Sequence, residues 1–324
     1  MTAIVAEQLT KRFPPAIDAV AGIDLSIARG QVFGFLGPNG SGKTTTVRML
    51  TTLLRPTSGR AAVDGLDVTR HSSEVRRRIG VALQDAGLDD LQTGRELLAL
   101  QGLLYNLDPR RVRERAAELL EVVDLVDAAD RWVKTYSGGM KRRLDLAAAL
   151  MHEPKIVFLD EPTTGLDPIS RESIWRYVRE LNANEGVTFF LTTQYLEEAD
   201  RLADVVAIMD RGRIVAQGSP AELKASIATD VITVRIDGAG GALERAAGAV
   251  RRIEGIEDVR TVDGSVVIYV RDGSRAVARV AVLLEEQSVH VDEMTLAHPT
   301  LDDVFLRSTG HHIEADEHQA EAAS

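Results

Sequence analysis

The fold of this chain is decided by Gly37-Pro38-Asn39-Gly40-Ser41-Gly42-Lys43-Thr44, which follows an apolar run at 32–36 and precedes a predicted helix at 45–54. Strand, glycine-rich loop and helix in this order predict a P-loop that binds phosphate. The glycines allow successive backbone N–H groups to turn around an anion, and the helix adds the positive end of its dipole. Lys43 can reach the β- and γ-phosphates, and the Thr44 hydroxyl is placed to ligate Mg²⁺. A chance glycine-rich turn is the alternative, but the flanking strand and helix favour a nucleoside triphosphate site.

The bulk composition limits the classes of protein to which the chain can belong. Its 324 residues favour a nucleotide-sized domain with a smaller one, and 44% hydrophobic residues are ordinary for a soluble protein. The absence of cysteine excludes disulfides and thiolate metal sites and fits a reducing cytoplasm. A net charge of −11 and only 4% aromatic residues argue against nucleic-acid binding. No uncharged apolar run approaches the ~20 residues that span a bilayer, and the N-terminus does not resemble a signal peptide. We therefore expect a soluble cytosolic protein.

Two other regions of the N-terminal half have clear periodicity. Residues 4–36 alternate in short polar and apolar runs, which predicts antiparallel strands leading into the P-loop. Residues 88–131 repeat apolar side chains at helical spacing without a strand signal, which predicts a helical insertion. Phe13 can stack on a nucleobase or simply cover the edge of a small sheet, and its position alone leaves both interpretations open.

A second possible anion site is formed by Ser137-Gly138-Gly139. These residues precede a predicted helix at 141–150, so the serine lies near a helix N-terminus and the two glycines leave backbone N–H groups uncovered. Taken alone, the segment favours the alternative, which is an ordinary serine N-cap.

Two acidic residues, Asp160 and Glu161, end an unbroken apolar run at 156–159. Such a run predicts a central parallel strand, and acids at its C-terminal end fall where open α/β sheets bind ligands. Asp160 can hold the Mg²⁺ shell, and Glu161 can orient or deprotonate a water against the γ-phosphate. Another apolar strand, 187–192, ends close to Gln194. Two acids that merely cap a turn are a weak alternative beside a P-loop.

Together these motifs resemble those of ATP-binding cassette ATPases over about residues 4–222. Residues 37–44 resemble the Walker A motif, 156–161 resemble Walker B with its adjacent glutamate, 137–139 resemble the family signature and 164–167 resemble the D-loop. The resemblance implies Mg²⁺ ligation by Thr44, Gln84 and Asp160, and catalytic roles for Lys43, Glu161 and Gln194. The nucleotide contacts that it implies are Phe13, Gly37, Pro38, Asn39, Gly40, Ser41, Gly42, Lys43, Thr44, Thr45, Gln84, Ser137, Gly138, Gly139 and Asp167.

The resemblance also implies partners. In this family the signature of one subunit closes over the P-loop nucleotide of another, so Ser137 and Gly139 should contact ATP held by a second chain. The working unit would then be a homodimer of head-to-tail cassettes. Gln84 matches the Q-loop glutamine, which would connect Mg²⁺ and the helical subdomain to a membrane partner. Phe13 matches the A-loop aromatic that stacks on adenine, although the family more often has tyrosine there.

One position departs from the family pattern. The switch residue after the strand that ends at Thr193 is normally histidine, but here it is Gln194, and none of the seven histidines lies near it. Glutamine can donate an N–H to a γ-phosphate but cannot exchange a proton near neutral pH. We therefore expect Glu161 to activate water and Gln194 only to position. The segments 193–200 and 136–140 resemble the daunorubicin-resistance type of exporter ATPase.

The pattern restarts beyond Gly218-Ser219-Pro220. Strands and helices alternate as βαββαβ, with a hairpin turn at Asp263-Gly264, which predicts a small ferredoxin-like α+β domain. No catalytic constellation is present there, so a regulatory, ligand-binding or dimer-stabilising role is open, and the resemblance favours dimer stabilisation. His311, His312 and His318 suggest a metal only weakly, because an acidic tail of this composition is expected to be disordered.

The sequence therefore predicts an α/β cassette core at 1–222, with a mixed or parallel sheet, an antiparallel β-subdomain and a helical subdomain at about 85–150. An accessory α+β domain at 223–308 and a disordered tail at 309–324 follow. The resemblance implies a subunit that hydrolyses ATP on the cytoplasmic side of the cell membrane and powers a separate permease, which exports drugs or lipophilic compounds. An importer ATPase shares every catalytic motif. A soluble cassette ATPase acting on ribosomes or DNA is disfavoured by the single cassette, the lack of sustained heptads and the negative charge.

Overall fold

The structure, a computed structural model, describes residues 1–83, 87–227, 230–236, 241–262, 264–287 and 289–311. These residues form two compact units, of which the first is built on Met1–Gln217 and the second begins at Gly218. The predicted domain boundary at residue 222 falls within helix α8 (Pro220–Ala225), the first helix of the second unit.

The first unit is built around a largely parallel sheet. Its strands are β3 (Val32–Leu36), β6 (Ile79–Ala82), β7 (Ile156–Asp160), β8 (Thr188–Thr193), β9 (Val205–Asp210) and β10 (Arg213–Gly218). They lie in the order β10-β9-β3-β8-β7-β6, and β6, β7, β8, β3 and β9 run parallel. Every residue of β3, β7 and β8 is buried, as expected for central strands covered on both faces. The two apolar strands predicted near the acids and near Gln194 are confirmed.

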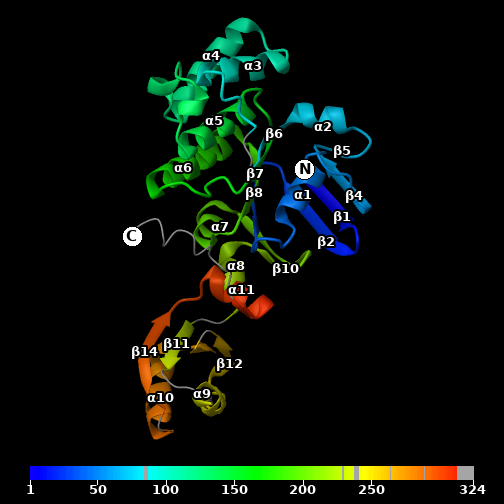
Figure 1. The fold of residues 1–324 in the computed structure, drawn as a ribbon. Helices are drawn as coiled ribbons and strands as arrows, with labels where there is room; N and C mark the ends of the chain where they lie inside the picture. Colours follow the sequence, from blue (N-terminus) through cyan, green and yellow to red (C-terminus); the bar gives the residue numbers. More distant parts are fainter. Residues whose placement is uncertain (84–86, 228–229, 237–240, 263, 288, 312–324) are drawn as a thin grey trace. The chain divides into compact units, whose positions relative to one another are not determined.

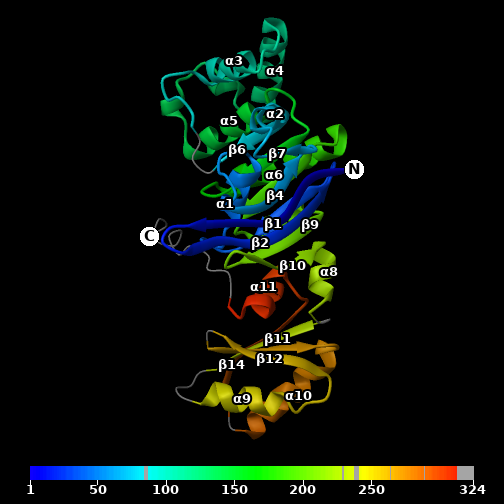
Figure 2. The same ribbon diagram turned by 90° about the vertical axis from the view of Figure 1, so that its right-hand side faces the viewer.

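An antiparallel sheet packs against this core. It consists of β1 (Thr2–Phe13), β2 (Ile17–Ala28), β4 (Ser58–Val63) and β5 (Leu66–Asp67), in the order β2-β1-β4-β5. Figure 2 shows β1 and β2 side by side along their length, as their antiparallel register requires. Apolar side chains of both sheets share one core, in which the rings of Phe33 and Phe35 lie 5.4 Å and 5.5 Å from that of Phe190. The antiparallel subdomain predicted from 4–36 is confirmed.

Four helices belong to the parallel sheet, and one of them has a side-chain hydrogen bond at its N-cap. They are α1 (Lys43–Leu50), α2 (Ser72–Arg78), α6 (Pro168–Glu185) and α7 (Leu196–Leu202). The predicted P-loop helix at 45–54 instead begins at Lys43 and ends at Leu50, because Thr52 takes a left-handed backbone conformation with φ 69°. Helix α6 begins with Asp167 as N-cap and a proline in its first turn, and ends at left-handed Gly186.

Three helices form the predicted helical insertion, and Figure 1 shows them grouped beyond the β6 and β7 edge of the sheet. They are α3 (Gly94–Leu104), α4 (Pro109–Val122) and α5 (Gly138–Leu150). Thr93 and Glu96 form a capping box at α3, and Asp108 caps α4 ahead of Pro109. The leucines of α3 do not share one buried face, since Leu97 and Leu98 are buried while Leu100, Leu103 and Leu104 are exposed.

The second unit has the predicted βαββαβ order. Its elements are β11 (Asp230–Ile236), α9 (Ala242–Val250), β12 (Ile256–Val262), β13 (Ser265–Val270), α10 (Gly273–Glu286) and β14 (Val291–Ala297), with α8 and α11 (Leu301–Thr309) outside this repeat. The sheet order is β12-β13-β11-β14 and its described pairings are antiparallel. Helices α9 and α10 cover one face and α11 lies on the other (Figure 2). This is the ferredoxin-like arrangement predicted from the pattern.

The helix predicted after Thr300 follows the last strand of this unit. Thr300 and Asp303 form a capping box, so the short helix predicted after Thr300 is present and continues to Thr309. Asp263 of the predicted hairpin turn, His312 and His318 lie outside the described residues. In the parts of the chain that the structure describes, no helix combines the length and the apolar character needed to cross a bilayer.

Candidate nucleotide-binding site

Three adjacent strands bring the predicted site together at their C-terminal ends. Strand β8 lies between β3 and β7, so the loops that follow these strands meet at one edge of the sheet. The P-loop follows β3, Glu161 follows β7 and Gln194 follows β8. Carboxyl ends of parallel strands are where open α/β sheets bind their ligands. Residues far apart in the sequence are therefore placed on one edge by the strand order alone.

The P-loop needs its glycines for space as well as for conformation. A Cβ on Gly37 would lie 2.3 Å from the backbone oxygen of Met209, and one on Gly42 would lie 2.3 Å from that of Ala19. Gly40 and Gly42 also take left-handed conformations, with φ of 78° and 110°. Larger residues would push the loop away from the sheet, so the backbone path of the loop depends on these three positions.

Lys43 is almost completely buried in the loop that it follows. Its Nζ donates to the carbonyl oxygens of Gly37 at 2.7 Å and Pro38 at 3.0 Å, and lies 3.7 Å from Oε1 of Glu161. Burial lowers the pKa of Lys43, and the nearby charges of Glu161 and Asp160 oppose that shift. The cation is thus held beside the loop and beside the predicted catalytic carboxylate at the same time.

The end of β7 presents both acids. Oδ1 of Asp160 accepts hydrogen bonds from the hydroxyls of Thr44 at 3.2 Å and Thr192 at 2.5 Å, while its buried Oδ2 has no hydrogen-bond partner among the described residues. Glu161 has a left-handed backbone with φ 50°, and its N–H donates to the Thr192 hydroxyl at 3.0 Å. Such a conformation is uncommon for a non-glycine residue and is often found at functional sites.

Two further polar atoms at this edge are buried without a described partner. They are the side-chain oxygen Oε1 of Gln194, which is 6% exposed, and the hydroxyl oxygen of Ser41. Buried polar groups are nearly always hydrogen-bonded, and the exceptions in a native structure indicate a missing ligand, ion or water. With Asp160 Oδ2, they give this edge three buried oxygen atoms without a described hydrogen-bond partner.

The predicted signature occupies a different kind of helix end. Ser137 caps α5 and its hydroxyl accepts from the N–H of Met140 at 3.2 Å, while Ser137 and Gly138 are exposed. Gly139 lies against Leu166, next to Asp167, which is the exposed N-cap of α6. Within the described residues, no hydrogen bond or ion pair joins 137–139 to the P-loop. The signature and the D-loop segment are therefore neighbours, and Ser137, Gly138 and Asp167 are exposed.

The remaining predicted residues are more peripheral. Phe13 is half-buried at the end of β1, with Nζ of Lys11 5.2 Å from its ring centroid. Thr45 lies in the first turn of α1 and is half-buried. Gln84 lies outside the described residues, between Leu83 and Gly87.

One residue of this site was missed from the sequence. Arg142 of α5 is buried and donates to three backbone carbonyls at the sheet edge, those of Leu83, Asp160 and Pro162. Its neighbour Asp145 lies 3.5 Å away, and burial raises the pKa of that carboxyl to about 6. The signal in the sequence is an Arg and an Asp three residues apart in the helix that follows Ser137.

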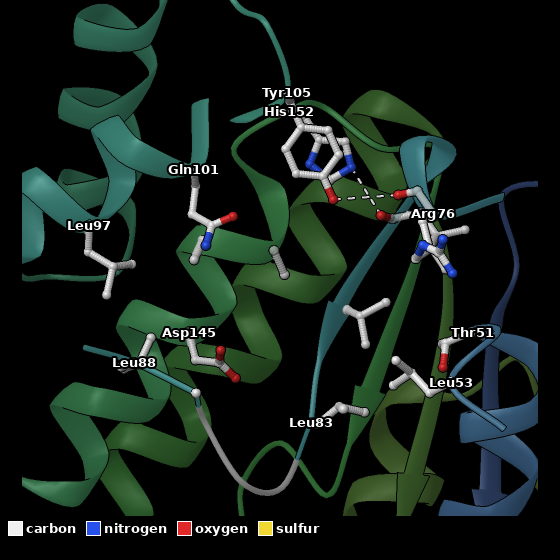
Figure 3. A pocket seen from close by; sticks show the side chains of 15 residues that line it. Thr51, Leu53, Arg76, Leu83, Leu88, Leu97, Gln101, Tyr105, Asp145 and His152 are labelled. Atoms are coloured by element: carbon white, nitrogen blue, oxygen red, sulfur yellow. Dashed lines mark hydrogen bonds between the residues drawn. The ribbon is translucent and has the colours of Figure 1, made fainter. Parts of the chain in front are cut away.

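A cavity of about 340 Å³ lies between the helical insertion and the sheet. Figure 3 shows its lining, where the ring of Tyr105 stacks on that of His152 at a centroid distance of 3.7 Å. The Tyr105 hydroxyl donates to the backbone oxygen of Arg76, and Asp145 reaches the cavity from α5. Leu83 and Gly87, which flank Gln84 in the sequence, both line it.

The fold and the site define the class of the protein, a P-loop ATPase with the architecture of an ATP-binding cassette. Family models agree with this assignment in both units. The family described as ABC transporter matches residues 20–164, and the family described as ATP-binding protein DrrA1-3-like, C-terminal domain, matches residues 218–309.

Individual relatives are similar over nearly the whole chain. The chain is 48% identical over 316 residues to the daunorubicin resistance ATP-binding protein DrrA2 of Streptomyces coeruleorubidus, with 97% of each chain covered. It is 46% identical over 306 residues to the daunorubicin/doxorubicin resistance ATP-binding protein DrrA of Streptomyces peucetius, covering 94% of this chain and 92% of the relative. A solved dimeric ATP-binding cassette in a post-hydrolysis state, bound to ADP and Pi, is 26% identical with a TM-score of 0.63, covering 67% of this chain and 98% of that one. The chain therefore belongs to the ABC transporter ATP-binding proteins of the daunorubicin/doxorubicin-resistance type, and it is an ATPase.

Proposed function

We propose that this chain is the ATP-binding and ATP-hydrolysing subunit that powers a separate membrane permease, which exports drugs or lipophilic compounds. The observation that carries the proposal is the pairing of a P-loop, whose buried Lys43 lies beside two acids, with a second helix N-terminus that is open to solvent. The names of the relatives, which refer to daunorubicin and doxorubicin resistance, support the class of cargo.

In this proposal ATP binds at the sheet edge described above. The backbone N–H groups of 37–44 and the ammonium group of Lys43 hold the β- and γ-phosphates, with help from the first turn of α1 through Thr45. Phe13 stacks on the adenine ring. The buried oxygen atoms without partners near the P-loop support a polar ligand at this place.

Mg²⁺ fits the oxygen atoms that gather beside the P-loop. Thr44, Asp160 and Gln84 would hold it, and the partnerless Oδ2 of Asp160 beside the Thr44 hydroxyl supports this assignment, since Mg²⁺ prefers oxygen ligands. When bound, the ion would neutralise charge on the phosphate oxygens.

Hydrolysis is assigned to the two residues that follow β7 and β8. Glu161 orients and deprotonates the attacking water, and its distance of 3.7 Å from Nζ of Lys43 places it beside the phosphate-binding cation. Gln194 positions the γ-phosphate or the water by hydrogen bonding, since an amide cannot exchange a proton near neutral pH.

The second half of each site comes from a second chain. Ser137, Gly138 and Gly139 of one subunit, with Asp167 beside them, would close over the nucleotide of the other in a head-to-tail homodimer. The exposure of this helix end supports that role. ATP shifts the pair toward the closed state only through contacts that the open state lacks. The second unit is proposed to stabilise this dimer.

The permease is proposed to dock on the cavity shown in Figure 3, on the cytoplasmic side of the cell membrane. Leu83 and Gly87, the described residues nearest in sequence to residues 84–86, both line this cavity. Its lining joins the helical insertion to β6, which suits a contact that transmits a movement of the helices.

The catalytic assignment is tested with Glu161→Gln, which keeps the shape of the side chain and removes its basicity. We expect hydrolysis to fall at least ~100-fold while ATP still binds and holds the chain as a dimer, measured by phosphate release and light scattering. Glu197→Gln, at an exposed position of α7, is the matched control and should hydrolyse at the parental rate. Parental hydrolysis by Glu161→Gln would contradict the assignment.

The proposed permease partner is tested by purifying this chain from solubilised cell membranes and identifying the proteins that copurify with it. We expect a permease to copurify, and daunorubicin or related lipophilic compounds to stimulate ATP hydrolysis by the reconstituted complex. Copurification with ribosomes or DNA instead would contradict the proposal, as would stimulation only by an external substrate-binding protein.

A further inference from the structure

Glu198 is a wholly buried carboxyl outside the residues assigned above. It lies in α7, one helical turn beyond Gln194, and is 0% exposed. Its Oε1 accepts hydrogen bonds from the hydroxyl of Thr163 at 2.9 Å and from the indole nitrogen Nε1 of Trp175 at 2.9 Å. Complete burial raises the pKa of this carboxyl.

The two donors come from segments with defined places in the site. Thr163 lies two residues after Glu161, and Trp175 belongs to α6, the helix that begins directly after Asp167. The single oxygen Oε1 therefore connects the switch helix to the loop after β7 and to the helix of the D-loop.

A second contact reinforces this connection. The guanidinium of Arg171 in α6 lies 4.8 Å from the centroid of the Tyr195 ring, and Tyr195 directly follows Gln194. Helix α6 thus contacts the switch segment at two points, through Arg171 and through Trp175. The position of Gln194 depends on α6 and on the loop after β7, and not only on β8.

A carboxyl is an unexpected choice for packing at this position. Burying an ionisable group is unfavourable unless its hydrogen bonds are satisfied, and an apolar side chain of similar size would avoid that penalty. An apolar residue would, however, leave the Thr163 hydroxyl and the indole N–H buried without an acceptor. The carboxyl oxygen is needed for the connection it makes.

We propose that Glu198 is a positioning residue for ATP hydrolysis, which holds Gln194 in register with Glu161 through Thr163 and Trp175. The inference rests on the proposed function, in which Glu161 and Gln194 act on the same γ-phosphate. Glu198 contacts neither the P-loop nor Lys43 in the described hydrogen bonds, so it should affect the rate of hydrolysis and not the binding of ATP.

The experiment compares Glu198→Met, which removes the acceptor, with Glu198→Gln, which keeps one, in the full-length chain assembled with its permease. We expect Glu198→Met to lower kcat about tenfold with KM for ATP changed less than about twofold, the pattern of a lost transition-state interaction. Glu198→Gln should retain at least about half of the parental kcat, because its amide oxygen can accept from both donors. Thr163→Val, which leaves the carboxyl in place, should lower kcat about threefold.

A double-mutant cycle separates positioning from general loss of structure. If Glu198 acts through Gln194, Glu198→Met should lower kcat by less than about twofold in a Gln194→Ala background. The full tenfold effect in that background would overturn the proposal, as would an unchanged kcat or a KM that rises with the fall in kcat. Thermal unfolding shows whether Glu198→Met is folded. If it is not, the same comparison is made with Thr163→Val in the parental and Gln194→Ala backgrounds, and a threefold loss of kcat in both would overturn the proposal.

A failure of the proposed function can be told apart from a failure of the Glu198 proposal. Parental hydrolysis by both Glu161→Gln and Gln194→Ala would contradict the catalytic assignment itself. Impaired hydrolysis in those two variants with parental hydrolysis in Glu198→Met would contradict only the positioning role.

Discussion

Helices α1 and α5 both begin next to glycines, yet their surroundings differ completely. The N-terminus of α1 contains buried Lys43, and the carboxylates of Asp160 and Glu161 lie beside it. The N-terminus of α5 is capped by its own Ser137, and both Ser137 and Gly138 are exposed. The same local motif adjoins buried charged groups in one place and an open surface in the other, because Asp160 ends and Glu161 follows the strand β7 that lies beside α1. What a helix N-terminus can bind is therefore decided by its tertiary neighbours.

The strongest test of this difference mixes two inactive variants. Lys43→Met disables the P-loop, and Ser137→Arg places a bulky side chain on the open helix end, so each alone should lose ATP hydrolysis by at least ~100-fold. In a head-to-tail dimer of the two, one site combines both defects and the other is intact. Mixed subunits should then recover about a quarter of the parental rate, measured by phosphate release. No recovery would mean that each chain completes its own site.

A smaller effect is expected at the switch position. Gln194→Ala removes a buried amide beside the P-loop and should lower kcat about tenfold with little change in ATP affinity, since Lys43 and the loop are untouched. Gln194→His is the matched variant, because histidine can also donate an N–H. Recovery by histidine with a new pH dependence near neutrality would show that the position accepts a proton carrier. A parental kcat for the alanine variant would remove Gln194 from the site.

Removal of the second unit asks whether the two helix ends are sufficient to hold the dimer. A chain ending at Gln217, where the first unit ends, keeps both of them. We expect ATP-dependent dimerisation to weaken several-fold, with hydrolysis recovering at high protein concentration, measured by light scattering and ATPase assays across a dilution series. Unchanged dimerisation and turnover would exclude a stabilising role for the second unit.

The smallest expected effect concerns the anchoring of α5. The pKa of Asp145 is raised from 3.8 to about 6 by burial, so the folded state retains this proton more readily than the unfolded state. The resulting stabilisation is fully present below pH 3.8 and is lost as pH rises through about 6. Relative to Asp145→Asn, the parent should therefore lose about 1.4 kcal/mol of unfolding free energy between pH 5 and pH 8.

Urea unfolding of both proteins across this range checks the shift. The exposed Asp127→Asn is the control for removing a carboxylate from the surface. A difference for Asp145→Asn that does not change with pH would show that this carboxyl keeps its ordinary titration in the fold.

Those parts of the site that are formed by consecutive residues could be predicted from the sequence. The P-loop, the signature and the acids after β7 each combine a chemical motif with a strand or helix beside it, and the strand order then unites them. Arg142 and Glu198 were not predicted as site residues, because their partners come from distant segments. Leu83 is 59 residues from Arg142, and Thr163 is 35 residues from Glu198. The periodicity of the sequence contains no information about contacts between residues so far apart.

The limits of helix prediction have a similar origin. The end of α1 at Leu50 depends on the left-handed backbone of Thr52, and threonine carries no strong signal for that conformation. The exposure of Leu100, Leu103 and Leu104 reflects the absence of a described neighbour on that side of α3. Spacing identified the helix correctly, but only the packed neighbours decide which of its leucines are covered.

The hydroxyl of Thr192 hydrogen-bonds to both acidic residues at the end of β7. A hydroxyl has one proton, and here it is donated to Oδ1 of Asp160, so the oxygen can only accept from the N–H of Glu161. One buried hydroxyl in β8 therefore contacts the side chain of Asp160 and the backbone of Glu161, while Oδ2 of Asp160 has no hydrogen-bond partner among the described residues. Serine could make the same two hydrogen bonds, whereas valine, with nearly the same shape, would remove both. Oδ1 of Asp160 would then accept only from the Thr44 hydroxyl, and the N–H of Glu161 would keep only its bond to the backbone oxygen of Thr192.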